Sequence, residues 1–543
     1  MGTFNGVYEP LFEGVGGFAS ISGTFVIASG GGLIATTAGT TASGIINLPQ
    51  IVNGSTMVWR FAALIQYNGD STNNTDVYVQ NPNDTSYGNF IFYISGGNLC
   101  TSVGGNSQLS VSGAVSGNSY WFVAASDGNQ VITAIIPAAH GGIIAGSGTA
   151  ANENYKIYAA TYANGAHTPA FEGMGQIYIT QKSTTNIVKG VFFNIGSLSG
   201  GSDSRMQPPA ICPVSITRPD GTVDNTGIVF IPETYHDASP GQPQYLVNHI
   251  HVTHPNNSTE QRGFLTTDPD GGAAFAYLRN AGFIMSLIRG DPSSFSNNYA
   301  SPWGGANGLG VRRQLLAWIA ANLPYVNNLF IIGQSMGGLD GLNLFMNDPS
   351  SISGYAGISA VANMTAAYNG SNSGTAESST IDAVYPSYYV SLQNSNTGNA
   401  LSNTTWWQQV TLPGGLLQAP YATDTNEGAY SSGTTYASGQ VVYSNATAMS
   451  QLADHDPTLR PGAFVNLPME FWHGTSDTTI PLAQLQAFQT AMSNLGVTVT
   501  INQVSGGHLA NSALWNGSAI ASLFRPATVP KATSIPTYKG GGV

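Results

Sequence analysis

Residues 328–340 constrain the fold of this chain more than any other segment. Their sequence is NLFIIGQSMGGLD, in which an apolar run leads into Gly-Gln-Ser-Met-Gly. Apolar residues resume over 339–346 at the spacing of a helix, so we predict a strand that ends at Ser335 and a helix that follows directly. A serine at so sharp a turn has a strained backbone and an outward hydroxyl, and Gly333 and Gly337 let strand and helix pass without a Cβ clash.

Two later segments end in the residue types that a nucleophilic serine needs. Such a serine requires a base to take its proton, and the base requires a carboxylate to orient it. The first segment, LPMEFWHGTSDTTIP at 467–481, carries Asp477 after a strand pattern. The second, VTVTINQVSGGH at 497–508, ends at His508. Three predicted strands therefore lead, in chain order, to Ser335, Asp477 and His508.

The pattern H-G-x-x-D-x-x-I-P, followed by a strand that ends in G-G-H, resembles the acid and base loops of the α/β-hydrolase family. Together with the G-x-S-x-G turn, the resemblance implies Ser335 as nucleophile, Asp477 as orienting acid and His508 as general base. It also implies an oxyanion hole. The Met336 N–H, at the N-terminus of a helix, is the first expected donor.

The loop after the third strand of the predicted hydrolase sheet departs from the family pattern. The family usually has a His-Gly turn there, whereas this chain has NHIHVTHPNN at 248–257. Pro255 has no N–H, so we expect the second oxyanion donor at Asn256. The three histidines of this segment invite a metal-site interpretation, but no acidic cluster accompanies them. We expect neither a metal nor a cofactor.

Other polar residues compete for roles in this site. Asp340 is a rival acid, although we expect it in the first turn after Ser335, where the helix dipole favours a carboxylate. Asp454 and Asp456 are further candidates, but no strand pattern precedes them. Asp477 could instead cap the next helix. His473 is predicted to be a structural turn residue.

The first 195 residues differ in pattern from the rest. Short alternating or apolar runs recur between Asn-Gly, Gly-Asn and Asp-Gly turns, which predicts an all-β sandwich over residues 1–195. The order of the runs resembles a laminin-G or concanavalin-like jelly roll, with the central strand and hairpin at 121–129 and the last strand at 171–179. Such domains often bind glycans, and an attachment or trimerisation module is an equal alternative. The predicted strands lie at 56–62, 76–80, 90–94, 120–124, 130–136, 155–159 and 175–180.

Residues 196–210 have the composition of a linker, and strands alternate with helices over 211–525. This alternation predicts an α/β-hydrolase domain with a doubly wound, mostly parallel sheet. A lid insertion is expected at about 363–459. Its aromatic residues either line a substrate site or pack the lid's own core, and Trp406 and Trp407 are the candidates for substrate binding. Residues 526–543 are expected to form an extended tail.

The composition limits partners and location. Only 8% of residues are charged and the net charge is −12, which argues against nucleic acid and anionic membranes as main partners. No stretch is long and apolar enough to span a membrane. Cys100 and Cys212 define no disulfide framework. An uncharged polar composition without a basic secretory n-region favours an extracellular or virion-surface protein released by lysis; a mature form numbered after cleavage is the alternative.

These observations predict a serine hydrolase of carboxylic esters. The sandwich favours a polymeric target, either an acetylated surface polysaccharide or a polyester, as for a phage tail esterase with homo-oligomeric or virion partners. A secreted polyester or plant-wall esterase and a peptidase of the prolyl-oligopeptidase type are enzymatic alternatives. A non-catalytic virion adhesin or structural protein, which keeps the hydrolase domain as a scaffold, is the alternative from another class.

Overall fold

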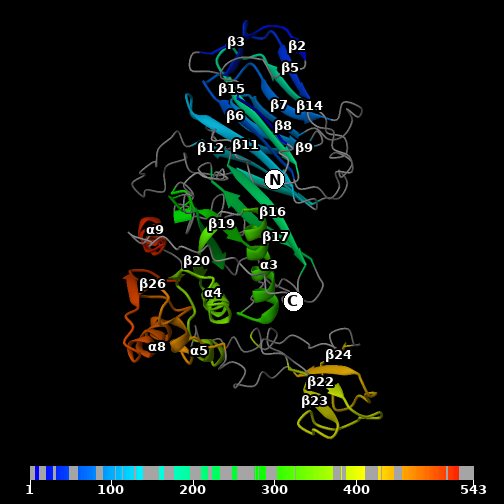
Figure 1. Cartoon of the computed structure of the whole chain (residues 1–543), viewed down its shortest axis with the longest axis vertical. Helices are drawn as coiled ribbons and strands as arrows, with labels where there is room; N and C mark the ends of the chain where they lie inside the picture. The colour runs from blue at the N-terminus through cyan, green and yellow to red at the C-terminus, as the bar shows by residue number, and fades with distance from the viewer. Residues whose placement is uncertain are drawn as a thin grey trace.

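The structure is a computed structural model in which Figure 1 traces the whole chain. The structure describes residues 6–10, 20–28, 32–47, 59–80, 90–103, 106–112, 114–126, 130–138, 158–163, 176–195, 209–217, 223–232, 247–253, 274–275, 277–278, 281–288, 303–323, 326–370, 381, 387–409, 426–429, 431–444, 455–508 and 512–524.

Two antiparallel sheets make up the N-terminal part. The eight-stranded sheet has the order β13-β12-β11-β6-β15-β4-β3, with β1 beside β15, and the seven-stranded sheet has the order β10-β9-β8-β7-β14-β5-β2. Apolar side chains from both sheets meet in one core, where the rings of Phe61 and Phe92 stack 4.8 Å apart. The strands are β1 Gly6–Pro10, β2 Ser20–Ser22, β3 Phe25–Ile27, β4 Leu33–Ala35, β5 Ala42–Asn47, β6 Trp59–Gln66, β7 Thr75–Gln80, β8 Phe90–Ser95, β9 Asn98–Val103, β10 Asn106–Val111, β11 Ser119–Ser126, β12 Gln130–Pro137, β13 Tyr158–Ala163, β14 Gln176–Gln181 and β15 Ile187–Ile195.

All seven strands predicted here overlap observed ones, but β14 is not the last strand. β15 follows it and pairs with β6, β4 and β1. The prediction missed β15 because its register shifts between Val188 and Gly190, and this bulge interrupts the alternation of apolar and polar residues. As expected, β11 lies inside its sheet, between β12 and β6. The assignment to a laminin-G or concanavalin-like jelly roll stays a prediction.

The C-terminal part contains an eight-stranded sheet with the order β16-β17-β19-β18-β20-β21-β26-β27. Its first two neighbour pairs are antiparallel, and every pair from β19 to β27 is parallel, so the predicted mostly parallel sheet is confirmed. The elements are β16 Ala210–Thr217, β17 Val223–Ile231, β18 Val247–Thr253, β19 Ile284–Leu287, α3 Ala306–Asn322, β20 Val326–Gln334, α4 Met336–Asn347, β21 Gly354–Ile358, η5 Pro461–Phe464, β26 Met469–Gly474, α8 Leu482–Ser493, β27 Thr500–Val504, η6 Ser512–Leu514 and α9 Gly517–Leu523.

Helices cover both faces of this sheet. On β20, Phe330 and Ile332 belong to an apolar cluster with residues of α9, and Phe330 stacks on Phe524 at 4.6 Å. Leu329 and Ile331, which point to the opposite face, belong to a second cluster with residues of α3, α4 and α8. A parallel strand that is apolar at consecutive positions is buried in this two-sided way.

The N-terminal sandwich packs directly against the C-terminal sheet. In Figure 1 the strands β11 and β12 lie above β16, and contacts join β16 to both of them. On β6, Phe61 and Ile65 face the core of the sandwich, whereas Leu64 shares an apolar cluster with Trp121 of β11 and Phe230 of β17. The strands β6 and β11 of the sandwich are therefore buried on both faces of their sheet.

The predicted insertion carries a small sheet of its own. After α5 (Met364–Tyr368), four strands pair in the order β23-β22-β25-β24. Their bounds are β22 Ser387–Ser391, β23 Trp407–Gln409, β24 Asn426–Ala429 and β25 Val441–Ser444. Figure 1 shows this sheet apart from the larger one. Residues 196–208 and 526–543, predicted to form a linker and a tail, lie outside the described residues.

Candidate active site

Ser335 lies at the turn between β20 and α4 with a strained backbone. Its φ of 51° and ψ of −129° are unusual for a residue with a side chain. Its N–H donates to the Ile358 carbonyl at 3.0 Å, and its own carbonyl accepts from the N–H groups of Gly338 and Val361, both at 2.9 Å. The end of β21 and the first turn of α4 therefore hold this conformation from both sides.

Close packing of glycines also fixes the turn. A Cβ on Gly333 would collide with the hydroxyl of Tyr355 and lie 2.8 Å from the Cα of Gly338. A Cβ on Gly338 would collide with Ala360 and lie 2.9 Å from the Val361 nitrogen. Gly333 was expected to have this role from the motif. Gly338 lies one residue beyond the motif, and the sequence pattern did not single it out.

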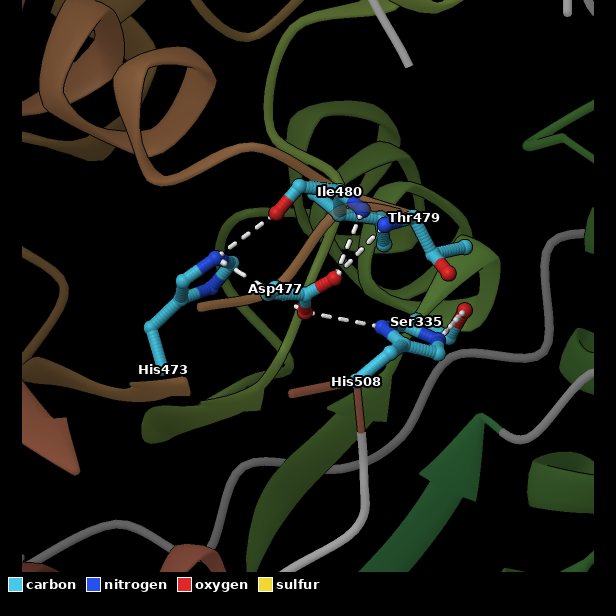
Figure 2. A network of polar contacts seen from close by, with 6 residues as sticks. All are labelled: Ser335, His473, Asp477, Thr479, Ile480 and His508. Atoms are coloured by element: carbon cyan, nitrogen blue, oxygen red, sulfur yellow. Dashed lines mark hydrogen bonds and ion pairs between the residues drawn. The ribbon is translucent and has the colours of Figure 1, made fainter. Parts of the chain in front are cut away.

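The structure brings Ser335, His508 and Asp477 together, as Figure 2 shows. Ser335 Oγ lies 3.0 Å from His508 Nε2, and His508 Nδ1 lies 2.8 Å from Asp477 Oδ2. An ionised carboxylate only accepts hydrogen bonds, so Nδ1 carries the proton of the neutral ring. His508 Nε2 then presents its lone pair to the serine hydroxyl, which is the arrangement that a general base needs.

The Asp477 carboxylate is buried but well supplied with donors. Its Oδ1 accepts from the backbone N–H groups of Thr479 at 3.0 Å and Ile480 at 2.8 Å, while Oδ2 accepts from His508. Burial alone would raise the pKa of Asp477, but the hydrogen bonds from His508 and Ile480 outweigh it and hold the pKa below its ordinary value. Asp477 does not cap α8, because Pro481 occupies that position.

Backbone contacts join the acid loop, residues 474–480, to the base loop, residues 505–508. The loops follow the neighbouring parallel strands β26 and β27. The N–H of Thr475 donates to Val504 O and that of Ser476 to Gly506 O, both at 2.8 Å. A Cβ on Gly474 would lie 2.6 Å from the carbonyl oxygens of Gly506 and Gly507. The distance between the acid and the base is thus set by backbone geometry.

His473 lies inside β26 and not in a turn, which corrects the sequence-based prediction. Its side chain is fully buried, and its Nε2 lies 2.8 Å from the carbonyl oxygen of Ile480. The same nitrogen lies 3.8 Å from Asp477 Oδ2. Burial is the main cause that lowers the pKa of His473, so its imidazole is neutral at neutral pH.

The rival acids make other contacts. Asp340 lies beyond the first turn of α4, so the predicted contact with the helix dipole is wrong; it is buried and paired with Arg312 of α3. Asp456 Oδ2 accepts from the backbone N–H and the hydroxyl of Thr365 at the start of α5. Asp454 lies outside the described residues.

The other predicted site residues are the two oxyanion donors and the two tryptophans of the insertion. Met336 is the first residue of α4, so its N–H lies at the positive end of the helix dipole. Asn256 lies outside the described residues. Trp407 is 2% exposed, and its indole N–H donates to Asn399 O. With Trp406 it packs in the core of the small sheet, which favours the alternative that these tryptophans stabilise the insertion. Substrate binding by Trp406 stays a prediction.

Among the described residues, no group of three or more His, Cys, Asp and Glu side chains is arranged to bind a metal ion. Within the same part of the chain, no helix has both the length and the apolar character needed to cross a bilayer.

Neither a protein-family model nor a curated protein matches this chain. Solved structures resemble it at low identity. S-formylglutathione hydrolase from Staphylococcus aureus is 14% identical over 60% of this chain and 100% of its own, with a TM-score of 0.35. Puromycin hydrolase is 9% identical over 92% and 81%, with a TM-score of 0.37, and a ferulic acid esterase is 11% identical over 58% and 97%, with a TM-score of 0.34. Likenesses this weak support no conclusion about function, which depends on the geometry of the chain itself.

Proposed function

We propose that this chain is a serine hydrolase that cleaves carboxylic esters, with Ser335 as nucleophile, His508 as general base and Asp477 as orienting acid. The observation that carries the proposal is the unbroken chain of contacts from Ser335 Oγ through the His508 ring to Asp477 Oδ2. The strained backbone of Ser335 supports it, because strain of this kind collects at functional sites.

In the first half of the reaction His508 Nε2 takes the proton of the Ser335 hydroxyl as Oγ attacks the ester carbonyl. Asp477 stabilises the imidazolium that forms, because its carboxylate already accepts from Nδ1. The tetrahedral oxyanion would be stabilised by the Met336 N–H and by a second donor, for which Asn256 remains our candidate. Collapse of this intermediate transfers the proton from His508 to the leaving alcohol.

In the second half, water attacks the acyl-enzyme with His508 again as the base, and Ser335 is regenerated with release of the acid. The exposure of the reacting groups fits this step. The His508 side chain is 19% exposed, so solvent reaches the base, while the Asp477 side chain is fully buried and keeps its charge next to the ring.

A polymeric ester is the substrate class that we propose, either an acetylated surface polysaccharide or a polyester. The sandwich that packs against the hydrolase sheet supports this choice, because it gives the molecule a second surface that could bind a polymer. The low content of charged residues, 8%, is consistent with a protein that works extracellularly or on a virion surface, such as a phage tail esterase.

The test is hydrolysis of p-nitrophenyl esters with short and medium acyl chains, beside Ser335→Ala. We expect turnover by the parent and its loss in the variant, by a factor of about 10⁶ if the triad acts as a unit. A serine-directed fluorophosphonate should label the parent at Ser335. If the parent shows no turnover and is not labelled, the proposal is rejected and a non-catalytic adhesin or structural protein is favoured. Labelling without turnover would reject only this choice of substrate.

A further inference from the structure

His473 has a place in the site that the triad does not explain. It is the residue before Gly474 at the end of β26, and its side chain is fully buried. Its Nε2 contacts the backbone of the acid loop, at the Ile480 carbonyl, at 2.8 Å. Figure 2 shows this ring on the opposite side of Asp477 from the His508 ring.

The direction of the hydrogen bond defines the tautomer of His473. A carbonyl oxygen only accepts, so the ring carries its proton on Nε2 and donates it to Ile480 O. The lowered pKa of His473, caused mainly by burial, keeps the ring from taking a second proton. A neutral ring does not compete with His508 for the Asp477 carboxylate, which lies 3.8 Å from His473 Nε2.

Both polar groups of the Ile480 backbone are thereby used to hold the acid loop. Its carbonyl accepts from His473, and its N–H donates to Asp477 Oδ1 at 2.8 Å. With Oδ1 held by Ile480 and Thr479, the carboxylate cannot rotate freely, and Oδ2 faces His508. The chain of contacts therefore runs from His473 through Ile480 to Asp477 and on to the base.

We propose that His473 is a positioning residue, which holds the backbone of residues 477–480 in the conformation that aims Asp477 at His508. The inference rests on the proposed function, because an effect on rate presupposes that His508 acts on Ser335. His473 touches neither the substrate nor the reacting atoms, so its substitution should change kcat and not KM.

Two amide substitutions test the hydrogen bond. His473→Gln places an amide nitrogen near the position of Nε2 and can still donate to Ile480, whereas His473→Asn is one methylene shorter and cannot reach it. We expect the Asn variant to lose about 10- to 100-fold in kcat at nearly constant KM, as for a small misplacement of a catalytic group, and the Gln variant to recover most of that loss. Equal kcat in the Asn variant and the parent, or equal loss in both variants, would overturn the proposal.

A spectroscopic measurement keeps the test separate from the proposed function. The proton on His508 Nδ1, bonded to Asp477, should give a low-field resonance in the parent and in the Gln variant that is lost or exchange-broadened in the Asn variant. This measurement needs no substrate. A parent that shows the resonance but neither hydrolyses an ester nor reacts with the fluorophosphonate would reject the proposed function, while the comparison of variants would still decide the role of His473.

The parent alone decides the matter if the Asn variant does not fold. Ring nitrogen shifts of His473 in protein labelled at histidine should show, at neutral pH, a proton on Nε2 only. A proton on Nδ1, or a charged ring at neutral pH, would overturn the proposal, because Ile480 O would then lose its donor or Asp477 would gain a competing cation.

Discussion

Two regions of this molecule hold a carboxylate that is at least partly buried, and they shift its pKa in opposite directions. In the acid loop, hydrogen bonds hold the pKa of Asp477 below its ordinary value although the side chain is fully buried. On β7, Asp76 lies on the outer face of the seven-stranded sheet, next to Tyr78, which stacks on Tyr178. Burial raises the pKa of Asp76 to about 6, and the charge of Lys182 offsets this only in part.

The difference lies in the donors aimed at each carboxylate. Asp477 accepts from the N–H groups of Thr479 and Ile480 and from His508. For Asp76, no hydrogen bond to the carboxylate is found among the described residues. Burial by itself therefore does not keep a carboxylate charged, and the acid loop differs from the sheet face because its backbone is folded around the charge.

Among the substitutions that test this comparison, Asp477→Asn should have the largest effect. The amide oxygen should stay with the two backbone N–H groups, so the NH2 group would face His508 and force its proton onto Nε2. That tautomer cannot accept the Ser335 proton, and we expect kcat to fall by about 10⁴-fold with little change in KM. The matched control is Asp456→Asn, a buried carboxylate that accepts from the backbone N–H groups of Thr365 and Thr458. A similar loss in both variants would contradict the assignment of the acid.

Gly474→Ala should have the next largest effect, through the distance between the acid and base loops. The new methyl group would lie 2.6 Å from two carbonyl oxygens of the base loop. We expect the loops to separate and kcat to fall about 10- to 100-fold. Gly507→Ala is the control, because its Cβ would meet only Ser476 O, at 3.8 Å. If steady-state rates fell as much in the control, the loop contact would not set the geometry.

Asp76→Asn should stabilise the protein at neutral pH. A pKa raised from 3.8 to about 6 corresponds to at most about 3 kcal/mol, and because the amide also lacks a partner we expect a gain of about 1 kcal/mol in the free energy of unfolding. The folded state binds this proton more tightly, so parental stability falls as pH rises from about 4 to about 6. The advantage of the variant in urea unfolding should therefore shrink toward pH 4.

The control for this substitution is Asp70→Asn in the same sandwich. Although burial acts in the opposite direction, hydrogen bonds from Ser183 and from the backbone of Asn73 and Thr72 lower the pKa of Asp70 to about 2. Asp70→Asn should destabilise the protein at neutral pH. Stabilisation by both substitutions would point to a general effect of negative charge and not to the missing donors at Asp76.

The smallest effect is the pH dependence that Asp477 contributes to stability. Its folded pKa is lowered, so the stabilisation is complete above the ordinary value for aspartate, near 3.9, and is lost as pH falls through the folded pKa. Thermal unfolding of the parent and of Asp477→Asn should therefore converge at acid pH. This pH dependence of stability is opposite in sign to that of Asp76. A difference in Tm between parent and variant that grows below pH 4 would contradict it.

The local patterns of the sequence predicted three residues that the structure brings together. Ser335, Asp477 and His508 each follow a strand whose apolar pattern is clear, and parallel strands place their carboxyl ends along one edge of a sheet. The contact of His473 with Ile480 was also within reach, since both belong to the H-G-x-x-D-x-x-I-P segment. The pairing of Asp340 with Arg312 was not, because it joins two helices and depends on tertiary packing.

In the sandwich the sequence was less informative. Strands with regular alternation, such as β7 and β14, were predicted, whereas the bulged β15 and the more polar β9 and β10 were among those missed. The run YWFVAA at 120–125 is apolar at consecutive positions because β11 is covered on both faces. That pattern indicates burial but does not identify the partners, since one face of β11 is covered by the seven-stranded sheet and the other by β16 and β17 of the C-terminal part.

The eight-stranded sheet of the sandwich is covered on one face by the C-terminal part, and this limits how the protein can be divided and how its two parts can evolve. Leu64, Trp121 and Phe192 share their apolar cluster with Ile228 and Phe230, so a chain cut between β15 and β16 would carry a water-exposed hydrophobic surface on each half. A change of shape on one side of this interface requires a compensating change on the other. The two halves should therefore vary together as one unit, and the sandwich cannot be exchanged between hydrolases as a freely tethered module can.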